Sequence, residues 1–199
     1  MKQILAAFII SSLFFVCCND DKTKDSGAVS SKNDKEQAAI DSGKVKDAAK
    51  DMQQLKEELS NLTPLSPDEL KAKVPEQLMD AAASDVGVNV AMGATVANAD
   101  YKINDSTNLK LEIVDCAGPG GAGMFGMQYL DMINVNSDDE DEYVKTIDLN
   151  GGKAFESCKK KDSKCSITFL SGNRFLVSLR GGNVGIDALK DLAKGLKIK

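Results

Sequence analysis

The N-terminal half of the chain carries a helical pattern of apolar residues. Between positions 45 and 62 they recur every three or four residues on a segment rich in Lys, Asp and Glu. This spacing predicts an amphipathic helix with one apolar stripe, which fits a short coiled coil, packing against a domain, or a solvated stalk. Thr63-Pro64 ends this helix, and Ser66-Pro67-Asp68-Glu69 predicts the start of another with Ser66 as its N-cap. Because Val74-Pro75 breaks the second helix, residues 39–74 form the predicted amphipathic helical segment.

Beyond residue 75 the apolar residues alternate with polar ones, as they do in strands. Residues 88–103 predict one long strand, with a bulge where the alternation slips by one position after Val96. Asn104-Asp105-Ser106 then turns the chain, and residues 109–113 predict the antiparallel partner strand.

Four more strands are predicted as a meander. A Gly-rich passage at residues 118–126 leads to a helix that ends near Ile133. The meander strands are then residues 143–149, 153–158, 165–169 and 175–179, and residues 186–196 predict a terminal helix with one apolar face. Residues 75–199 are therefore predicted to form a single α+β domain, with about six antiparallel strands and helices flanking the sheet on one face or both.

The first 17 residues read as an export signal. Lys2 supplies a positive end, and residues 4–16 form an apolar run that only Ser11 and Ser12 interrupt. The run is too short to span a bilayer, which needs about 20 helical residues. Residues 18–38 are polar and mixed in charge, without apolar periodicity, and this composition predicts a flexible tether.

Phe15-Val16-Cys17-Cys18 resembles the cleavage box of bacterial lipoproteins. In that family the signal is removed just before a Cys that carries lipid, and a small residue precedes that Cys. Cys18 fits better than Cys17, because bulky Val16 precedes Cys17. The resemblance implies a membrane anchor through fatty acyl chains, such as palmitate, on Cys18. An ordinary secretory signal is the alternative.

The residues after Cys18, Asn19-Asp20-Asp21-Lys22, resemble the looser boxes of Bacteroidetes lipoproteins, some of which are displayed on the cell surface. The resemblance implies a location in the bacterial cell envelope, at the outer membrane. It leaves open whether the protein faces the periplasm or the surface.

Residues 101–196 resemble a group of uncharacterised bacterial envelope proteins and lipoproteins. The shared features are a strand with Tyr101, a strand that ends at Asp115, a hairpin at residues 143–154 and a "gnRFLV" strand before a terminal amphipathic helix. These motifs are structural rather than catalytic, so the resemblance implies a compact fold of the PsbP/Mog1 kind and no known activity. Asp141-Glu142 replaces the family's Asp-Gly before the hairpin, which leaves that turn's geometry open.

The composition excludes several classes of function. The 199 residues include no His and carry a net charge of -5, with 5% aromatic residues. Without His, the usual Ser/His and Cys/His nucleophile pairs and imidazole metal sites are excluded. An acidic chain with few aromatic residues also lacks the basic, stacking surface that nucleic acids bind. We therefore expect a noncatalytic binding or interaction module without a cofactor, whose partner is an envelope protein; the alternative is a hydrolase using carboxylates or a lone Ser. The oligomeric state stays open.

Several groups of residues allow a functional hypothesis as well as a structural one. Residues 121–126 match G-x-G-x-x-G, but hairpins follow, so a flexible connection or a close-packed helix start is favoured over a dinucleotide site. The acidic run offers Asp138, Asp139 and Asp141 as Ca²⁺ ligands, but it fits no EF-hand register and favours a solvated loop. Arg174 and Arg180 could bind an anion, although solvent exposure is the favoured interpretation.

Five methionines could supply a soft Cu(I) site but are expected to fill the core instead. They are Met79, Met92, Met124, Met127 and Met132.

The cysteines predict one disulfide. With Cys17 removed and Cys18 acylated, Cys116, Cys158 and Cys165 remain in an oxidising compartment. In a symmetric hairpin Cys158 and Cys165 lie opposite on one face and can bond, although a one-residue slip of register stays possible. Cys116 is then the odd thiol and is expected to be buried.

Overall fold

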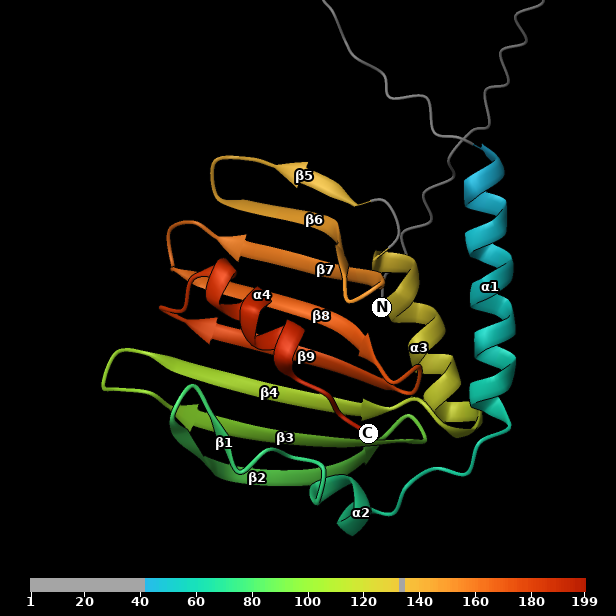
Figure 1. Cartoon of the computed structure of the whole chain (residues 1–199), viewed down its shortest axis with the longest axis horizontal. Coiled ribbons are helices and arrows are strands. Elements are labelled where there is room, and N and C mark those ends of the chain that lie inside the picture. The colour runs from blue at the N-terminus through green and yellow to red at the C-terminus, as the bar shows by residue number, and fades with distance from the viewer. Residues whose placement is uncertain (1–41, 133–134) are drawn as a thin grey trace, which may run out of the picture. The chain divides into compact units, whose positions relative to one another are not determined.

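A computed structural model describes residues 42–132 and 135–199, and these belong to one compact unit (Figure 1). Its described helices are α1 (Ser42–Ser60), α2 (Pro67–Lys71), α3 (Gly118–Met132) and α4 (Ile186–Gly195). Its described strands are β1 (Gln77–Leu78), β2 (Ala81–Ala91), β3 (Ala94–Lys102), β4 (Asn108–Asp115), β5 (Asn136–Asp138), β6 (Glu142–Leu149), β7 (Gly152–Lys159), β8 (Lys164–Ser171) and β9 (Phe175–Gly182). The predicted signal peptide and tether lie outside the described residues.

All described strands join one antiparallel sheet in the order β1-β2-β3-β4-β9-β8-β7-β6-β5. The prediction of an antiparallel sheet with flanking helices is confirmed, and so is the meander from β6 to β9. The number of strands is wrong, because the described part of the chain has nine and not about six. The additional strands are the short edge strands β1 and β5, and β2, which the predicted long strand had absorbed.

The predicted long strand is a hairpin rather than a bulged strand. Met92 and Gly93 both have positive φ, of 52° and 80°, and they form the two-residue turn between β2 and β3. The apparent slip after Val96 has another cause. Residues 94–97 of β3 are buried on both faces of the sheet, so apolar side chains follow one another there without alternation.

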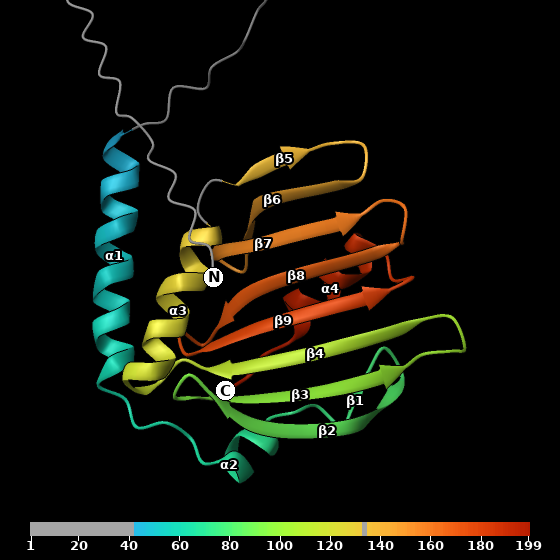
Figure 2. The same cartoon turned by 180° about the vertical axis from the view of Figure 1, so that it is seen from behind.

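The two faces of the sheet are covered unequally. One face, which we call the closed face, packs against α4 through Leu189 and Ala193, and against α2 through Leu70 (Figure 1). Within residues 42–132 and 135–199, the opposite face is covered only at one end, where α3 lies between the sheet and α1 (Figure 2). We call this second face the open face. The docking predicted for the terminal helix is confirmed.

The amphipathic helix packs on the domain, one of the three arrangements that its stripe allowed. Leu59 of α1 is buried with Phe125 of α3 in a cluster separate from the core of the closed face. Ser66 caps α2 as predicted, and the Glu69 carboxylate accepts a hydrogen bond from the Ser66 N–H at 2.8 Å. Leu59 and Leu70 both precede residue 75 and both are buried, so this segment contributes to the packing of the compact unit.

The Gly-rich passage is the first half of α3 itself. A Cβ on Gly120 would lie 2.6 Å from backbone atoms of Gly93, and one on Gly121 would lie 2.6 Å from the Asp115 carbonyl oxygen. Only glycine allows the helix to approach the β2–β3 turn and the end of β4 so closely. The close-packed helix start is therefore correct, and the flexible connection is wrong.

Candidate functional site

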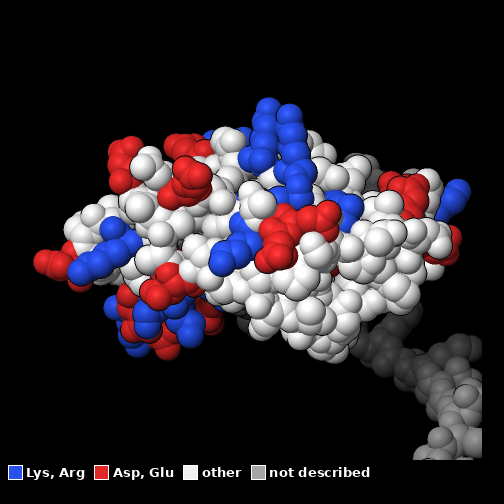
Figure 3. All heavy atoms as spheres, turned by 90° about the horizontal axis from the view of Figure 1, so that it is seen from below, with Lys and Arg blue, Asp and Glu red and all other residues white. Residues whose placement is uncertain are grey.

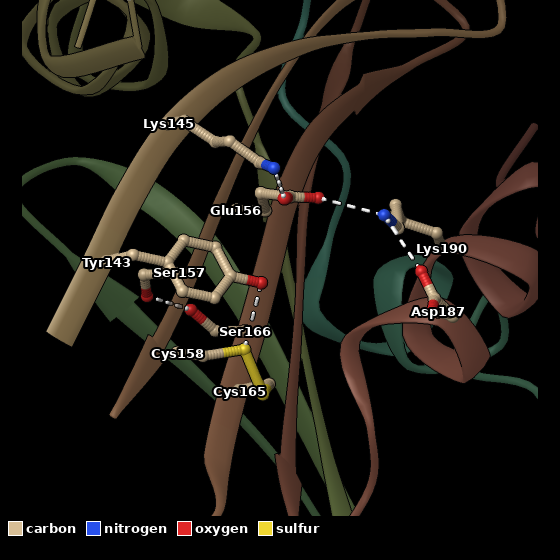
Figure 4. The surroundings of a disulfide bond; sticks show 9 residues. All are labelled: Tyr143, Lys145, Glu156, Ser157, Cys158, Cys165, Ser166, Asp187 and Lys190. Atoms are coloured by element: carbon tan, nitrogen blue, oxygen red, sulfur yellow. Dashed lines mark hydrogen bonds and ion pairs between the residues drawn. A yellow bond between two sulfur atoms is a disulfide. The ribbon is translucent and has the colours of Figure 1, made fainter. Parts of the chain in front are cut away.

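The predicted disulfide joins Cys158 and Cys165, which are direct partners in the ladder between β7 and β8. Their Cα atoms are 4.0 Å apart, and no slip of register occurs. Figure 4 shows the Tyr143 ring beside this bond, with its hydroxyl 3.2 Å from Cys158 Sγ. Because a disulfide sulfur has no hydrogen, the hydroxyl is the donor. Burial, and then the charge of Glu156, raise the pKa of Tyr143.

Cys116 is free and fully buried, as predicted. Burial raises the pKa of its thiol to about 12, so the thiolate needed for reaction does not form near neutral pH. Cys18, the predicted acylation site, lies outside the described residues.

Glu156 places a carboxylate under the closed face. Its side chain is fully buried, and its two oxygens lie 3.0 Å from Lys145 Nζ and 3.5 Å from Lys190 Nζ (Figure 4). Neither oxygen accepts a hydrogen bond of good geometry within the described part of the chain, so the two ammonium groups stabilise it by charge. A hydrogen bond to Asp187, and then the charge of Glu156, raise the pKa of Lys190. The cluster ties α4 to β6 and β7.

A second buried carboxylate, Asp115, ends β4. Arg174 donates to it from Nε at 2.8 Å and from an Nη at 3.0 Å, and the backbone N–H groups of Leu65 and Ala117 donate at 2.7 and 3.2 Å. Burial alone would raise the pKa of Asp115, but these hydrogen bonds outweigh it and the pKa lies below its usual range. Arg174 also donates to the Thr63 carbonyl at 2.9 Å. The network fastens the segment between α1 and α2 to the end of the sheet.

The structure therefore corrects the prediction for Arg174. Its side chain is 24% exposed and binds a carboxylate of its own chain, so it is not simply a solvated residue. Arg180 is 58% exposed and lies 3.5 Å from Glu112, as a surface residue would.

The acidic run spans the last residue of β5, the turn after it and the first residue of β6. Asp138 pairs with Lys160 at 2.6 Å, and Asp141 pairs with Lys161. Asp139 accepts hydrogen bonds from the backbone N–H groups that follow it, and these bonds lower its pKa. Among the described residues no group of three or more metal-ligating side chains could hold an ion.

Three of the five methionines contradict the prediction that they fill the core. Met92 is 72% exposed at the β2–β3 turn, Met127 is 53% exposed on α3, and Met79 is also exposed. Met124 is partly buried against the cluster around Leu59. The side chain of Met132 lies outside the described residues. Turn positions and the outer side of a helix place these three side chains at the surface.

The open face holds a hollow of about 290 Å³, lined by strand residues at the end of the sheet away from α3. Two neighbouring rows of cross-strand partners form it, because the register of β4, β9, β8 and β7 brings them side by side. Its lining includes four cationic side chains, two serines, one asparagine and one carboxylate. They are Lys110, Lys159, Lys164, Arg180, Ser157, Ser166, Asn108 and Glu142.

Small residues keep the hollow open. Gly182 lies between Asn108 and Lys164 in its row, and a Cβ there would come within 2.2 Å of the Asn108 side-chain oxygen. The hydroxyl oxygens of Ser157 and Ser166 are 2.9 Å apart. Figure 3, seen from the β2 edge with the open face at the bottom, shows charges of both signs gathered over this end of the strands. The arrangement can bind a small polar ligand.

Sequence reasoning weighed Arg180 as an anion ligand but did not find the other lining residues. Alternation could place each lysine on one side of its strand, but only the pairing order β4-β9-β8-β7 brings them together. Comparisons with protein-family models, with curated proteins and with solved structures find no match to this chain. No helix in the described part of the chain is long and apolar enough to cross a membrane.

Proposed function

We propose that this protein is a noncatalytic binding module of the bacterial cell envelope, held to the membrane by lipid on Cys18. The export signal and the Cys17-Cys18 box support the anchor, and the family resemblance supports the envelope. Its binding surface is the open face of the sheet.

The single observation that supports binding is the hollow on the open face. Natural ligand sites are concave and carry a few polar groups that fix the ligand's orientation, as this hollow does. An antiparallel sheet that leaves one face in water can use that face for recognition without disturbing its core.

The chemistry of the hollow favours binding over hydrolysis. Hydrolysis by carboxylates needs two acidic groups about one substrate, and among the described residues Glu142 is the one carboxylate that lines the hollow. The buried carboxylates Asp115 and Glu156 are both bound to cations of their own chain. Ser157 and Ser166 contact each other, and no base lies within hydrogen-bond distance of either in the described residues.

Photo-crosslinking in intact membranes tests the binding surface. A crosslinking side chain at Asn98, which is exposed on β3 of the open face, should capture an envelope component. The matched control places the same side chain at Asp187, which is 90% exposed on α4 over the closed face. Equal capture from both positions, or capture from Asp187 alone, would contradict the assignment of the surface.

Lipid labelling tests the anchor separately. Cys18→Ala should block labelling and release the protein from the membrane fraction, whereas Cys17→Ala should retain labelling at Cys18. The opposite result would move the acylated residue to Cys17.

A further inference from the structure

The open-face hollow has an unusual charge arrangement. Lys110 lies directly opposite Arg180 in the β4–β9 ladder, and Lys159 lies directly opposite Lys164 in the β7–β8 ladder. Like charges that face each other across strands destabilise a sheet. Here two such pairs border the same hollow, from different strands.

Elsewhere the same sheet pairs opposite charges. Asp148 faces Lys153 across the β6–β7 ladder, with 2.6 Å between the charged groups. Asp100 lies opposite Lys110, and Glu142 lies opposite Lys159, so a carboxylate flanks each like-charge pair on its outer side. The inner sides of both pairs face the hollow, where the two serine hydroxyls lie between them.

The existing partners of these cations leave them available. Arg180 lies 3.5 Å from Glu112, and Lys164 lies 3.6 Å from Asp162. Lys110 lies 3.1 Å from Asp100, and in each of the three ion pairs the cationic side chain is solvent-exposed. Exposed ion pairs are weak and rearrange easily. A ligand in the hollow can therefore draw the cations inward without breaking a buried contact.

We propose that the hollow binds a phosphate group, either as the free ion or as a phosphomonoester headgroup. Four cations can neutralise a group with two negative charges, and the planar Arg180 guanidinium can donate two parallel hydrogen bonds to phosphate oxygens. The hydroxyls of Ser157 and Ser166 supply further donors. The inference deepens the proposed binding function and rests on it.

Calorimetric titration of the full chain in neutral detergent at low salt tests the inference. Inorganic phosphate and glycerol 3-phosphate are the two probes, and both should bind saturably at one site. Tighter binding of glycerol 3-phosphate would assign the site to an esterified headgroup, and tighter binding of inorganic phosphate would assign it to the free ion.

Variants locate the site. Arg180→Ser and Lys159→Ser should each weaken binding at least about tenfold, since each removes charge-assisted hydrogen bonds. Lys153→Ser is the matched control, because Lys153 is an exposed lysine on the same strand as Lys159 but outside the hollow. It should leave the affinity unchanged.

Absence of saturable binding by both probes would overturn the inference, as would an equal loss in Lys153→Ser. If the Asn98 crosslinker still captured an envelope component on the open face, the proposed binding function would stand without the phosphate. The two failures are therefore distinguishable.

Discussion

The closed and open faces of the sheet treat charge in opposite ways. Under the closed face, Asp115 and Glu156 are fully buried, and each contacts a cation of its own chain at 3.0 Å or less. On the open face Arg180 and Lys110 lie opposite each other and are exposed. Each pairs with a carboxylate only at the surface, Arg180 with Glu112 at 3.5 Å and Lys110 with Asp100 at 3.1 Å. Buried charges must be paired or they destabilise the fold, whereas exposed ion pairs are weak and can rearrange around a ligand. The difference assigns stability to one face and recognition to the other.

The largest effect on the free energy of unfolding should come from a substitution of Asp115. If that effect were absent, the contrast between the two faces would be wrong. Asp115→Ala leaves Arg174 and the Leu65 N–H without their carboxylate, at a site that also fastens the segment between α1 and α2 to the sheet. We expect the free energy of unfolding to fall by about 3–5 kcal/mol. Urea unfolding followed by circular dichroism measures it. A loss below about 1 kcal/mol would mean that the network does not stabilise the closed face.

Reduction of the disulfide should have the next largest effect. Cys158 and Cys165 are separated by 7 positions, so their bond closes a short loop and stabilises by about 2–3 kcal/mol on the chain-entropy model. The Cys158→Ser/Cys165→Ser double variant should therefore unfold at lower temperature but still cooperatively. Nonreducing peptide mapping should find this linkage with Cys116 alkylated only after unfolding. A linkage through Cys116 would contradict the strand register.

The pH dependence of stability tests the packing of the closed face through Tyr101. Its ring is fully buried, its hydroxyl donates to the Pro75 carbonyl at 2.7 Å, and burial raises its pKa to about 12 from 10.0. The folded state therefore retains a proton that the unfolded state loses, and stability should fall as the pH rises from 10 towards 12. Tyr101→Phe should cost about 1 kcal/mol at pH 7 and flatten this alkaline decline. An unchanged decline would show that another group causes it.

The smallest effect should come from the open face. Glu112 lies on the same strand as Asp115 and also pairs with an arginine, but its ion pair with Arg180 is exposed. Glu112→Ala should change the free energy of unfolding by less than about 1 kcal/mol, measured in the same urea experiment. A loss as large as that of Asp115→Ala would remove the distinction between the faces.

Local features of the fold were predictable, because neighbouring residues determine them. The capping box at Ser66, the turn at Asn104 and the Cys158–Cys165 pair each depend on a few adjacent positions. The β2–β3 turn was missed because Met92 occupies it with a positive φ, which methionine rarely adopts. Strand β5 was missed because its three exposed polar residues carry no apolar pattern.

The residues of the candidate sites could be grouped only once the order of the strands was known. Asp115 and Arg174 are 59 positions apart, and no spacing rule joins them. Likewise, the two like-charge pairs meet only because β9 lies between β4 and β8. A sequence shows which residues face the same side of one strand, but it does not show which strands lie side by side.

The most direct test of the account is to locate the phosphate-binding site on the protein. Amide chemical-shift mapping of the full chain during a phosphate titration measures this by residue. We predict shifts centred on the hollow around Lys110, Ser166 and Arg180, with the amides of α4 around Lys190 unchanged. Shifts centred on α4 and the closed face, or spread evenly over the surface, would contradict the division of roles between the two faces.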